Sequence, residues 1–489
     1  MRKIEKRNER RNWESQSEPM LGGSDIRYEV DGRYKGIPCG GIGAIHTMCK
    51  KIGLAQGIDS DLRLLKRHLP YFDSDHILNL AYNILVGGQC VNDVERLRND
   101  EGYLDALGAE TIPGATTEGD FLRRFDANSI LALMEIINET RKTVWRKQSP
   151  AFFDKATINC DGTIVSTEGE CKEGMDISYK GEWGYAPLLI SLAETREPLW
   201  FVNRSGNAPS HLGSAEWIDR SLDLVCEDFK EVWLRGDTDF SLTANFDKWD
   251  ERCRFVFGID ARPNLRKIAE SIPEKVWELL GKKDKYKIRT EPRERPENVK
   301  ERIVIERDYK RITTECESVA EFEYKPGKCG KTYRIVALRK EILVLRGEMP
   351  LFPDVLWFFY ITNDRTMTPS EVVRFARSRC DHENDIEQLK NGVHAMKAPS
   401  DSLNSNWAYM VIAALAWNMK AWYGMLNPNR KLGWQIIRME FKRFRDTFVN
   451  IVCLIIKKGR GITYRFIAYN KNLKDVIRAH SVIKDMSFN

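Results

Sequence analysis

Three acidic side chains stand where carboxylates could act on a substrate. Asp161 closes the apolar run "KATINCDGTIVS", Asp237 closes "EVWLRGD", and Glu383 lies within "RSRCDHENDIEQLKNG". The first two follow expected strands, at whose carboxyl ends sheet proteins hold ligands, and the third lies on an expected helix. Hard oxygen ligands suit Mg²⁺, and two such ions can stabilise the attacking and leaving oxygens of a phosphodiester. The three acids therefore predict a site for metal-assisted phosphoryl chemistry.

The helix that carries Glu383 supplies a second argument. Arg379, Glu383 and Lys390 are spaced i, i+4 and i+11 and so share one face. An arginine that precedes its glutamate stabilises a helix less than the reverse order, so this face is better explained by an inward polar site than by helix stabilisation. The alternative is an ordinary solvated face, and among 71 acidic residues an ordered D…D…E triple is uninformative without the positions of its members. Helical phase predicts that the neighbouring acids face solvent: Asp381, Asp385 and Glu387.

The elements around these acids predict an α/β fold. Period-two patterns predict three strands from residue 155 to 207, followed by a helix, a strand ending at Asp237, a second helix and a strand over 254–260. Helical spacing covers residues 74–147, and another helix is expected over 368–393, opened by Thr368 and Pro369. Between them the pattern indicates an inserted, mostly β segment.

These patterns divide the chain into five expected parts. They are an all-helical N-terminal domain (1–150), the first part of a catalytic core with Asp161 and Asp237 (151–261), a β-rich insertion (262–350), the second part of the core with Glu383 (351–430) and a basic C-terminal region (431–489).

Charge is unevenly distributed along the chain. The net charge is +6, yet residues 411–489 hold 15 Lys and Arg against 4 Asp and Glu, and "MRKIEKRNERR" is a smaller basic cluster. Concentrated positive charge is typical of proteins that bind a polyanion, although a solvated basic face is the alternative. If residues 437–448 form one helix, Arg438, Lys442 and Arg445 share a cationic face that could follow a phosphate backbone.

Composition also indicates a compartment. The eleven cysteines are scattered, without a CxxC pair or a zinc-like cluster, which favours a reduced cytoplasm. The start of the chain lacks the apolar core of a signal peptide. Residues 407–426 approach the length of a membrane span, but Asn418 and Lys420 interrupt them, so we expect a buried helix and no membrane partner.

Together these motifs resemble the DDE transposases of bacterial insertion sequences, in the RNase H-like group with a Y-x2-R-x3-E-x6-K signature and a β-strand insertion. "NCDGT" and "WLRGDTDF" resemble the two aspartate strands, and Arg379, Glu383 and Lys390 match R-x3-E-x6-K. "RSGNAPSHLGSAEWI" resembles the segment between the aspartates, and "NSNWAYMVIAALAWNMKAW" the helix after the glutamate. The chain departs from the signature at Ala376, which stands at the tyrosine position beside Phe375.

The resemblance implies a function and a set of site residues. Asp161, Asp237 and Glu383 would bind two Mg²⁺ or Mn²⁺ ions for cleavage and strand transfer, with Asp239 as a second candidate ligand. Arg379 and Lys390 would contact DNA phosphates. It also implies an RNase H-like core, double-stranded DNA partners (terminal inverted repeats and target DNA), a homo-oligomer such as a dimer on DNA, and a cytoplasmic, nucleoid-associated location.

Two other functions stay open from the residues. One is an RNase H-like nuclease that cuts without strand transfer. The other is a non-catalytic DNA-binding derivative of a transposase, which Ala376 favours.

Overall fold

The computed structural model describes residues 26–29, 32, 34–66, 70–281, 298–347, 349–459, 461–467 and 472–488. The basic cluster at residues 1–11 lies outside them. The chain forms two compact units, one from Met1–Gln148 with Gln388–Asn489 and the other from Ser149–Glu387. No helix within the described ranges is long and apolar enough to cross a membrane.

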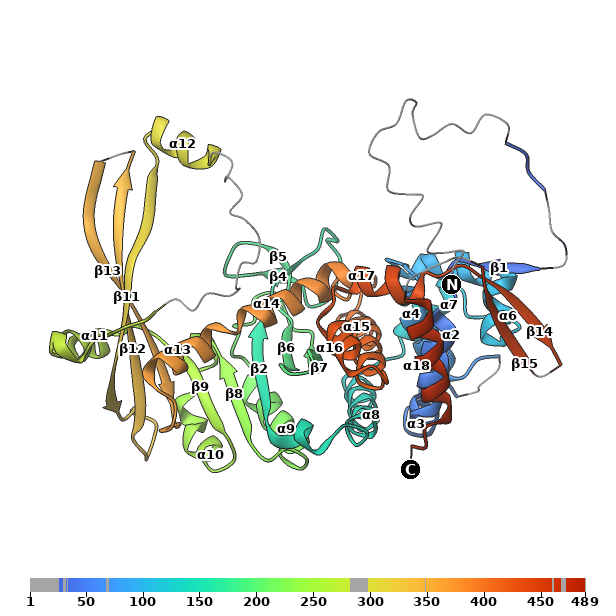
Figure 1. The fold of residues 1–489 in the computed structure, drawn as a ribbon, viewed down its shortest axis with the longest axis horizontal. Helices are drawn as coiled ribbons and strands as arrows, with labels where there is room; N and C mark the ends of the chain where they lie inside the picture. The colour runs from blue at the N-terminus through green and yellow to red at the C-terminus, as the bar shows by residue number, and fades with distance from the viewer. Residues whose placement is uncertain are drawn as a thin grey trace. The chain divides into compact units, whose positions relative to one another are not determined.

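The unit from Ser149 to Glu387 is built on a nine-stranded mixed sheet (Figure 1). Its strand order is β10-β11-β12-β13-β9-β8-β2-β6-β7. The strands are β2 (Ala156–Gly162), β6 (Leu188–Leu192), β7 (Glu197–Val202), β8 (Val232–Gly236), β9 (Arg254–Ile259), β10 (Glu278–Leu279), β11 (Lys310–Tyr324), β12 (Tyr333–Arg346) and β13 (Met349–Thr362). The expected α/β class is confirmed.

Strand β2 lies at the junction between antiparallel and parallel pairing. It pairs antiparallel with β6 and parallel with β8, which is in turn parallel with β9. The three strands, helix, strand, helix and strand expected from the sequence are present, with α9 (Ser214–Cys226) and α10 (Phe246–Asp250) as the helices. A small sheet that was not predicted follows β2 and comprises β3 (Val165–Ser166), β5 (Trp183–Tyr185) and β4 (Asp176–Ile177).

The two faces of the large sheet are covered by different helices. Trp217 of α9 contacts Trp200, which lies on the same sheet face as Cys160 by cross-strand register. The preceding residue of β2, Asn159, points to the opposite face because side chains alternate. That face receives α13 (Pro369–Arg377), whose Val372 and Val373 pack with an apolar cluster that comprises Trp233, Val256, Val319, Val336 and Leu338.

The described part of residues 262–350 is mainly β structure. Long strands β11 and β12 pair antiparallel, and β13 joins them to β9 through Phe359–Thr362. The described part also contains α11 (Pro263–Glu270) and α12 (Val299–Glu306). The insertion therefore extends the same sheet that carries Asp161.

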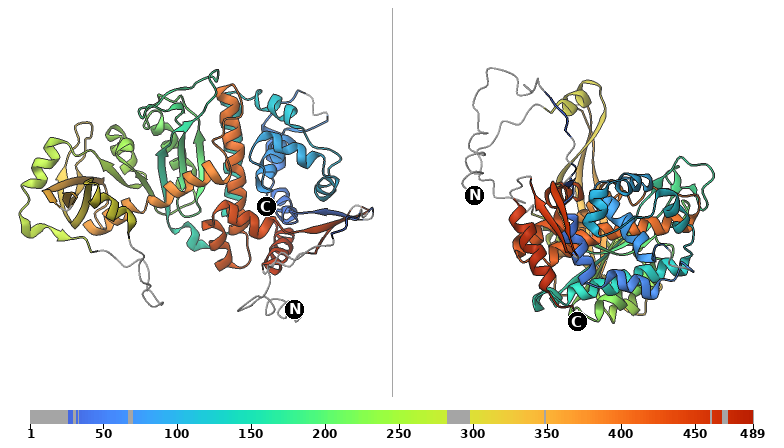
Figure 2. Two further views of the ribbon diagram at one scale, coloured as in Figure 1. Left: turned by 90° about the horizontal axis from the view of Figure 1, so that it is seen from above. Right: turned by 90° about the vertical axis from the view of Figure 1, so that its right-hand side faces the viewer.

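The other unit is mainly helical. Helix α15 (Leu403–Met425) is buried from Ser405 to its end and packs against α2, α4, α7, α8, α16 and α17 (Figure 2). The helices of this unit are α2 (Ile42–Lys51), α3 (Leu54–Asp61), α4 (Asp73–Leu85), α5 (Val94–Arg98), α6 (Glu101–Leu107), α7 (Ala115–Leu122), α8 (Ala127–Trp145), α15, α16 (Arg430–Arg438), α17 (Phe441–Phe444) and α18 (Leu473–Asp485). A three-stranded sheet joins β1 (Lys35–Ile37), β14 (Cys453–Lys458) and β15 (Gly461–Phe466).

The prediction of a single helix over residues 437–448 is wrong. Helix α16 ends at Arg438 because Met439 is extended, with φ −70° and ψ 142°. The amine of Lys420 donates a hydrogen bond of 2.6 Å to the Met439 carbonyl oxygen and holds this end of α16. Lys442 lies on α17, and Arg445 opens a π-helical turn. Arg438, Lys442 and Arg445 therefore do not form one helical face.

The helix expected over residues 368–393 is also interrupted. Its start is as predicted, because Thr368 caps α13 and exchanges hydrogen bonds with Glu371. Helix α13 ends at Arg377, α14 (Cys380–Glu387) follows, and a π-helical turn covers Gln388–Gly392. Arg379 thus lies in the break between α13 and α14, and the helix is not continuous through it.

The histidine of α2 makes stability depend on pH. Burial lowers the pKa of His46 to about 4, and its Nδ1 lies 3.1 Å from the Tyr82 hydroxyl. The folded chain therefore favours the neutral ring. The stabilisation that this gives is complete above pH 6.5 and is lost as the pH falls towards 4. In urea titrations, the free energy of unfolding should fall between pH 8 and pH 5, and His46→Phe should reduce this fall by about 2 kcal/mol. His211→Phe, at an exposed position, is the control, and an unchanged His46→Phe profile would refute the assignment.

Candidate active site

The register between β2 and β8 brings two of the predicted acids together. Ala156 lies opposite Val232 and Asn159 opposite Arg235 in the parallel pairing. Asp161 lies two residues beyond Asn159 on β2, and Asp237 lies two residues beyond Arg235, directly after the end of β8. In-register residues of parallel strands project to the same face, so both carboxylates lie on the face that α13 covers.

Arg379 lies among the three predicted acids. Its Nη1 atom is 2.8 Å from Oδ2 of Asp237 and 3.7 Å from Oδ2 of Asp161. Its Nη2 atom is 3.7 Å from Oε1 of Glu383, one helical turn further along. The structure therefore brings Asp161, Asp237, Glu383 and Arg379 into one cluster, from two strands and the α13–α14 junction.

The acids of this cluster differ in their exposure. The side chain of Asp161 is 13% exposed, whereas that of Glu383 is 59% exposed. Burial, together with the nearby carboxylates of Asp237 and Glu383, raises the pKa of Asp161 to about 7, and Arg379 acts in the opposite direction. A buried acid with like charges beside it favours the approach of positive charge. Glu383 gives the cluster an edge that solvent reaches.

Two neighbours of Glu383 were not predicted to be buried. Asp385, which was expected to face solvent, is buried, and its Oδ1 lies 3.6 Å from Nη1 of Arg196. His382 is fully buried, and its Nδ1 is 2.9 Å from the Ser191 hydroxyl of β6. Burial lowers the pKa of His382 to about 3. His382, Asp385 and Ile386 have the i, i+3, i+4 spacing of one helical face, and that spacing was the available signal.

Arg235 connects strand β2 to the junction between α13 and α14. Its Nε donates to Oδ1 of Asn159 at 2.8 Å, and its Nη1 donates to the Phe375 carbonyl oxygen at 3.0 Å and to the Ser378 hydroxyl. The guanidinium carbon also lies 5.1 Å from the centre of the Phe375 ring. Arg235 is buried, so these contacts are shielded from water. It therefore fixes the backbone that precedes Arg379, and sequence patterns gave no sign of this role.

The other predicted site residues lie on different elements of the chain. Lys390 lies in the π-helical turn, in the unit that includes Gln388–Asn489. Arg438, Lys442 and Arg445 belong to the same unit, and the Arg445 side chain is mostly buried with its Nε 3.4 Å from Asp446. Their contacts with DNA stay predictions. Asp239 is exposed in a short 3₁₀ turn, and its backbone N–H donates to Asp237.

The donor set of the cluster fits a divalent cation chemically. Carboxylate oxygens are the ligands that Mg²⁺ and Mn²⁺ accept, and Asp161, Asp237 and Glu383 supply three carboxylates around one positive charge. Within the described residues, no three His, Cys, Asp or Glu side chains are close enough to hold a metal ion as they stand. The guanidinium of Arg379 supplies the positive charge between the acids.

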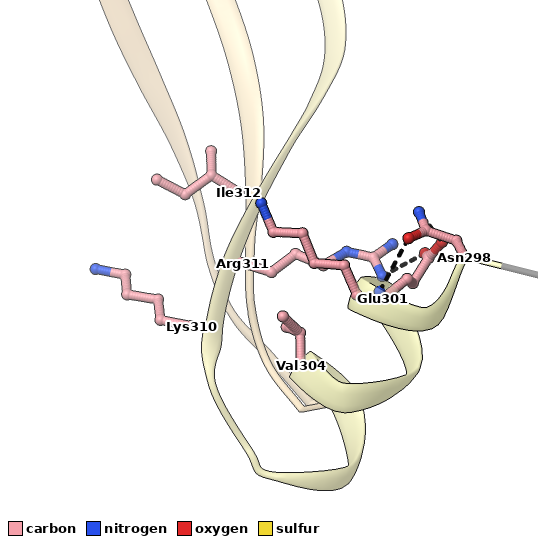
Figure 3. A pocket seen from close by; sticks show the side chains of 7 residues that line it. Asn298, Glu301, Val304, Lys310, Arg311 and Ile312 are labelled. Atoms are coloured by element: carbon pink, nitrogen blue, oxygen red, sulfur yellow. Dashed lines mark hydrogen bonds and ion pairs between the residues drawn. The ribbon is translucent and has the colours of Figure 1, made fainter. Parts of the chain in front are cut away.

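A pocket apart from the acid cluster lies in the insertion, between α12 and β11. It has a volume of about 440 Å³ between α12 and the start of β11, as Figure 3 shows. Glu301 is the acid that lines it, and its carboxylate pairs with Arg311 and accepts a hydrogen bond from the side-chain amide of Asn298. The remaining polar lining includes Lys300 and Lys310. Without a free carboxylate pair, this pocket lacks the donors for phosphoryl chemistry.

Comparison with known proteins gives a family match over nearly the whole chain. The model of the family described as "Transposase DDE domain group 1" matches residues 19–486. No curated protein matches the chain. Among solved structures, the chain is similar to a piggyBac transposase synaptic complex with hairpin DNA, with 11% identity, a TM-score of 0.38, and coverage of 85% of this chain and 83% of the other.

Proposed function

Because the chain belongs to the family of transposase DDE domains, group 1, we propose that it is the DNA transposase of an insertion sequence. It binds terminal inverted repeats and catalyses DNA cleavage and strand transfer. The observation that carries the proposal is the cluster in which Asp161 and Asp237 project from adjacent parallel strands and share Arg379 with Glu383.

The acids and the cations have different roles in the proposed reaction. Transposases of this family generally use divalent metal ions. Asp161, Asp237 and Glu383 would hold two such ions, which when bound neutralise developing charge and make a bound water or hydroxyl more acidic. Arg379, released from the acids, would contact a DNA phosphate. Lys390 is proposed as a further phosphate contact.

The catalytic core is proposed to be RNase H-like. Its support is the strand order β7-β6-β2-β8-β9, with antiparallel pairing on one side of β2 and parallel pairing on the other. The central strand of this arrangement carries Asp161 and its parallel neighbour leads into Asp237. The proposed setting is a homo-oligomer on DNA, associated with the nucleoid in the cytoplasm.

Incubation with DNA tests the function directly. Purified protein, Mg²⁺ and a duplex that carries the repeats flanking its gene should yield cut ends that are then joined to a target plasmid. Cuts without joined products would indicate a nuclease, and a bound but uncut duplex would indicate a DNA-binding derivative. Either result would overturn the proposed strand transfer.

Glu383→Gln should lower cleavage in this assay at least about a hundredfold. The substitution keeps the size of the side chain and removes its charge, so it removes one oxygen ligand without disturbing an exposed position. Glu387→Gln is the matched control, because Glu387 is an exposed acid on the same helix. Equal activities of the two variants would exclude Glu383 from the site.

A further inference from the structure

Helix α16 presents a basic surface with an exposed tryptophan at its centre. Arg430, Trp434 and Arg438 are spaced i, i+4 and i+8, and Lys431 lies beside them. All four side chains are exposed, and 42% of the large apolar side chain of Trp434 is accessible. We name these four residues the α16 surface. No acidic residue occurs in the helix, and three of the four residues of the surface are positively charged.

The opposite side of α16 is held rigidly on α15. Gly433, Ile436 and Ile437 are buried, and a Cβ added to Gly424 of α15 would lie 2.9 Å from the Gly433 carbonyl oxygen. The two helix backbones therefore approach closely, and Lys420 holds the end of α16 through Met439. The α16 surface is thus presented by a helix whose orientation is fixed by packing.

The indole and the cations form one unit in space. The guanidinium carbon of Arg438 lies 5.4 Å from the centre of the Trp434 ring. Arg430 donates a hydrogen bond of 2.9 Å to Gln148 and still remains exposed. Lys442 and Arg443 are exposed on α17, the next helix along the chain. Aromatic rings between cations suit strands whose bases are unpaired, because bases stack on the ring while phosphates meet the cations.

We propose that the α16 surface binds single-stranded DNA, with Trp434 stacked on an unpaired base and Lys431 and Arg438 at the flanking phosphates. This inference rests on the proposed function, since cuts at offset positions in the two strands of an element end leave unpaired bases. Charge complementarity favours DNA over a protein partner, because three cations would face a polyanion.

Binding of a labelled 20-nucleotide oligothymidine to the full chain, measured by fluorescence anisotropy in EDTA, tests the proposal. Trp434→Ala should weaken binding about tenfold, and Trp434→Phe should restore most of it because a ring remains. Lys431→Gln and Arg438→Gln should each reduce the slope of log K against log salt by about 0.7. Binding of a blunt duplex of the same length should change less than twofold in Trp434→Ala.

Trp183→Ala is the matched control, because Trp183 at the start of β5 is 43% exposed. Unchanged oligothymidine binding by Trp434→Ala, or an equal loss in Trp183→Ala or with the duplex, would overturn the proposal. An unchanged circular dichroism melt would show that Trp434→Ala is folded, and Trp434→Phe serves if it is not. If Trp434→Ala loses oligothymidine binding but the unsubstituted chain never cuts DNA, the proposed transposase function is contradicted and the α16 surface is still supported.

Discussion

Asp161→Asn is expected to lower metal-dependent DNA cleavage at least about a thousandfold while the chain stays folded. Asp161 is the most buried acid of the cluster and shares the Arg379 guanidinium with Asp237 and Glu383. Loss of its charge removes a ligand at the point where charge stabilisation contributes several kcal/mol. Cleavage is measured under single-turnover conditions, with the melting temperature determined in parallel.

The stability of this variant separates chemistry from folding. Burial raises the pKa of Asp161 to about 7, so the folded chain favours a neutral side chain at this position. Asp161→Asn should therefore melt at the same or a higher temperature at pH 8 in EDTA. Asp239→Asn, on an exposed turn two residues past Asp237, should keep full cleavage. Normal cleavage by Asp161→Asn, or a larger loss in Asp239→Asn, would show that the ligands are assigned wrongly.

Arg235→Ala is expected to cost about 3 to 4 kcal/mol of unfolding free energy. Hydrogen bonds from a charged donor contribute about 1.5–3 kcal/mol each, and the substitution leaves the buried Asn159 and the Phe375 carbonyl without this donor. Urea denaturation followed by circular dichroism measures the change. Cleavage should fall as well, because Arg235 positions the backbone before Arg379.

An exposed arginine provides the control for this substitution. Arg266→Ala on α11 should change the unfolding free energy by less than about 0.5 kcal/mol. If Arg235→Ala were as stable as Arg266→Ala, the contacts of Arg235 would not hold the helix junction. A stable Arg235→Ala with full cleavage would also exclude the positioning role.

The sequence was informative where local patterns decide the structure. The strands that end near Asp161 and Asp237 follow from apolar runs closed by Gly162 and Gly236, and the Thr368 cap follows from local chemistry. The two aspartates are 76 residues apart in the sequence. They come together because β2 and β8 pair in parallel. Strand ends alone do not determine such a register.

Long-range contacts explain what the sequence did not predict. Arg379 was expected to contact DNA, and its place among three acids depends on the break between α13 and α14. The basic tail has a helical period, yet Met439 is extended and Lys420 of α15 bonds its carbonyl oxygen. Tertiary contacts of this kind override local propensity.

Iron-directed backbone cleavage tests the central claim that Asp161, Asp237 and Glu383 share a cation site. Fe²⁺ replaces Mg²⁺ at carboxylate sites and, with ascorbate and peroxide, cuts the backbone beside its ligands. The assay needs no DNA substrate. We predict cuts near residues 161, 237 and 383 that are suppressed by excess Mg²⁺ and lost together in Asp161→Asn. Cuts elsewhere, or cuts near 237 and 383 that persist in Asp161→Asn, would contradict a shared site.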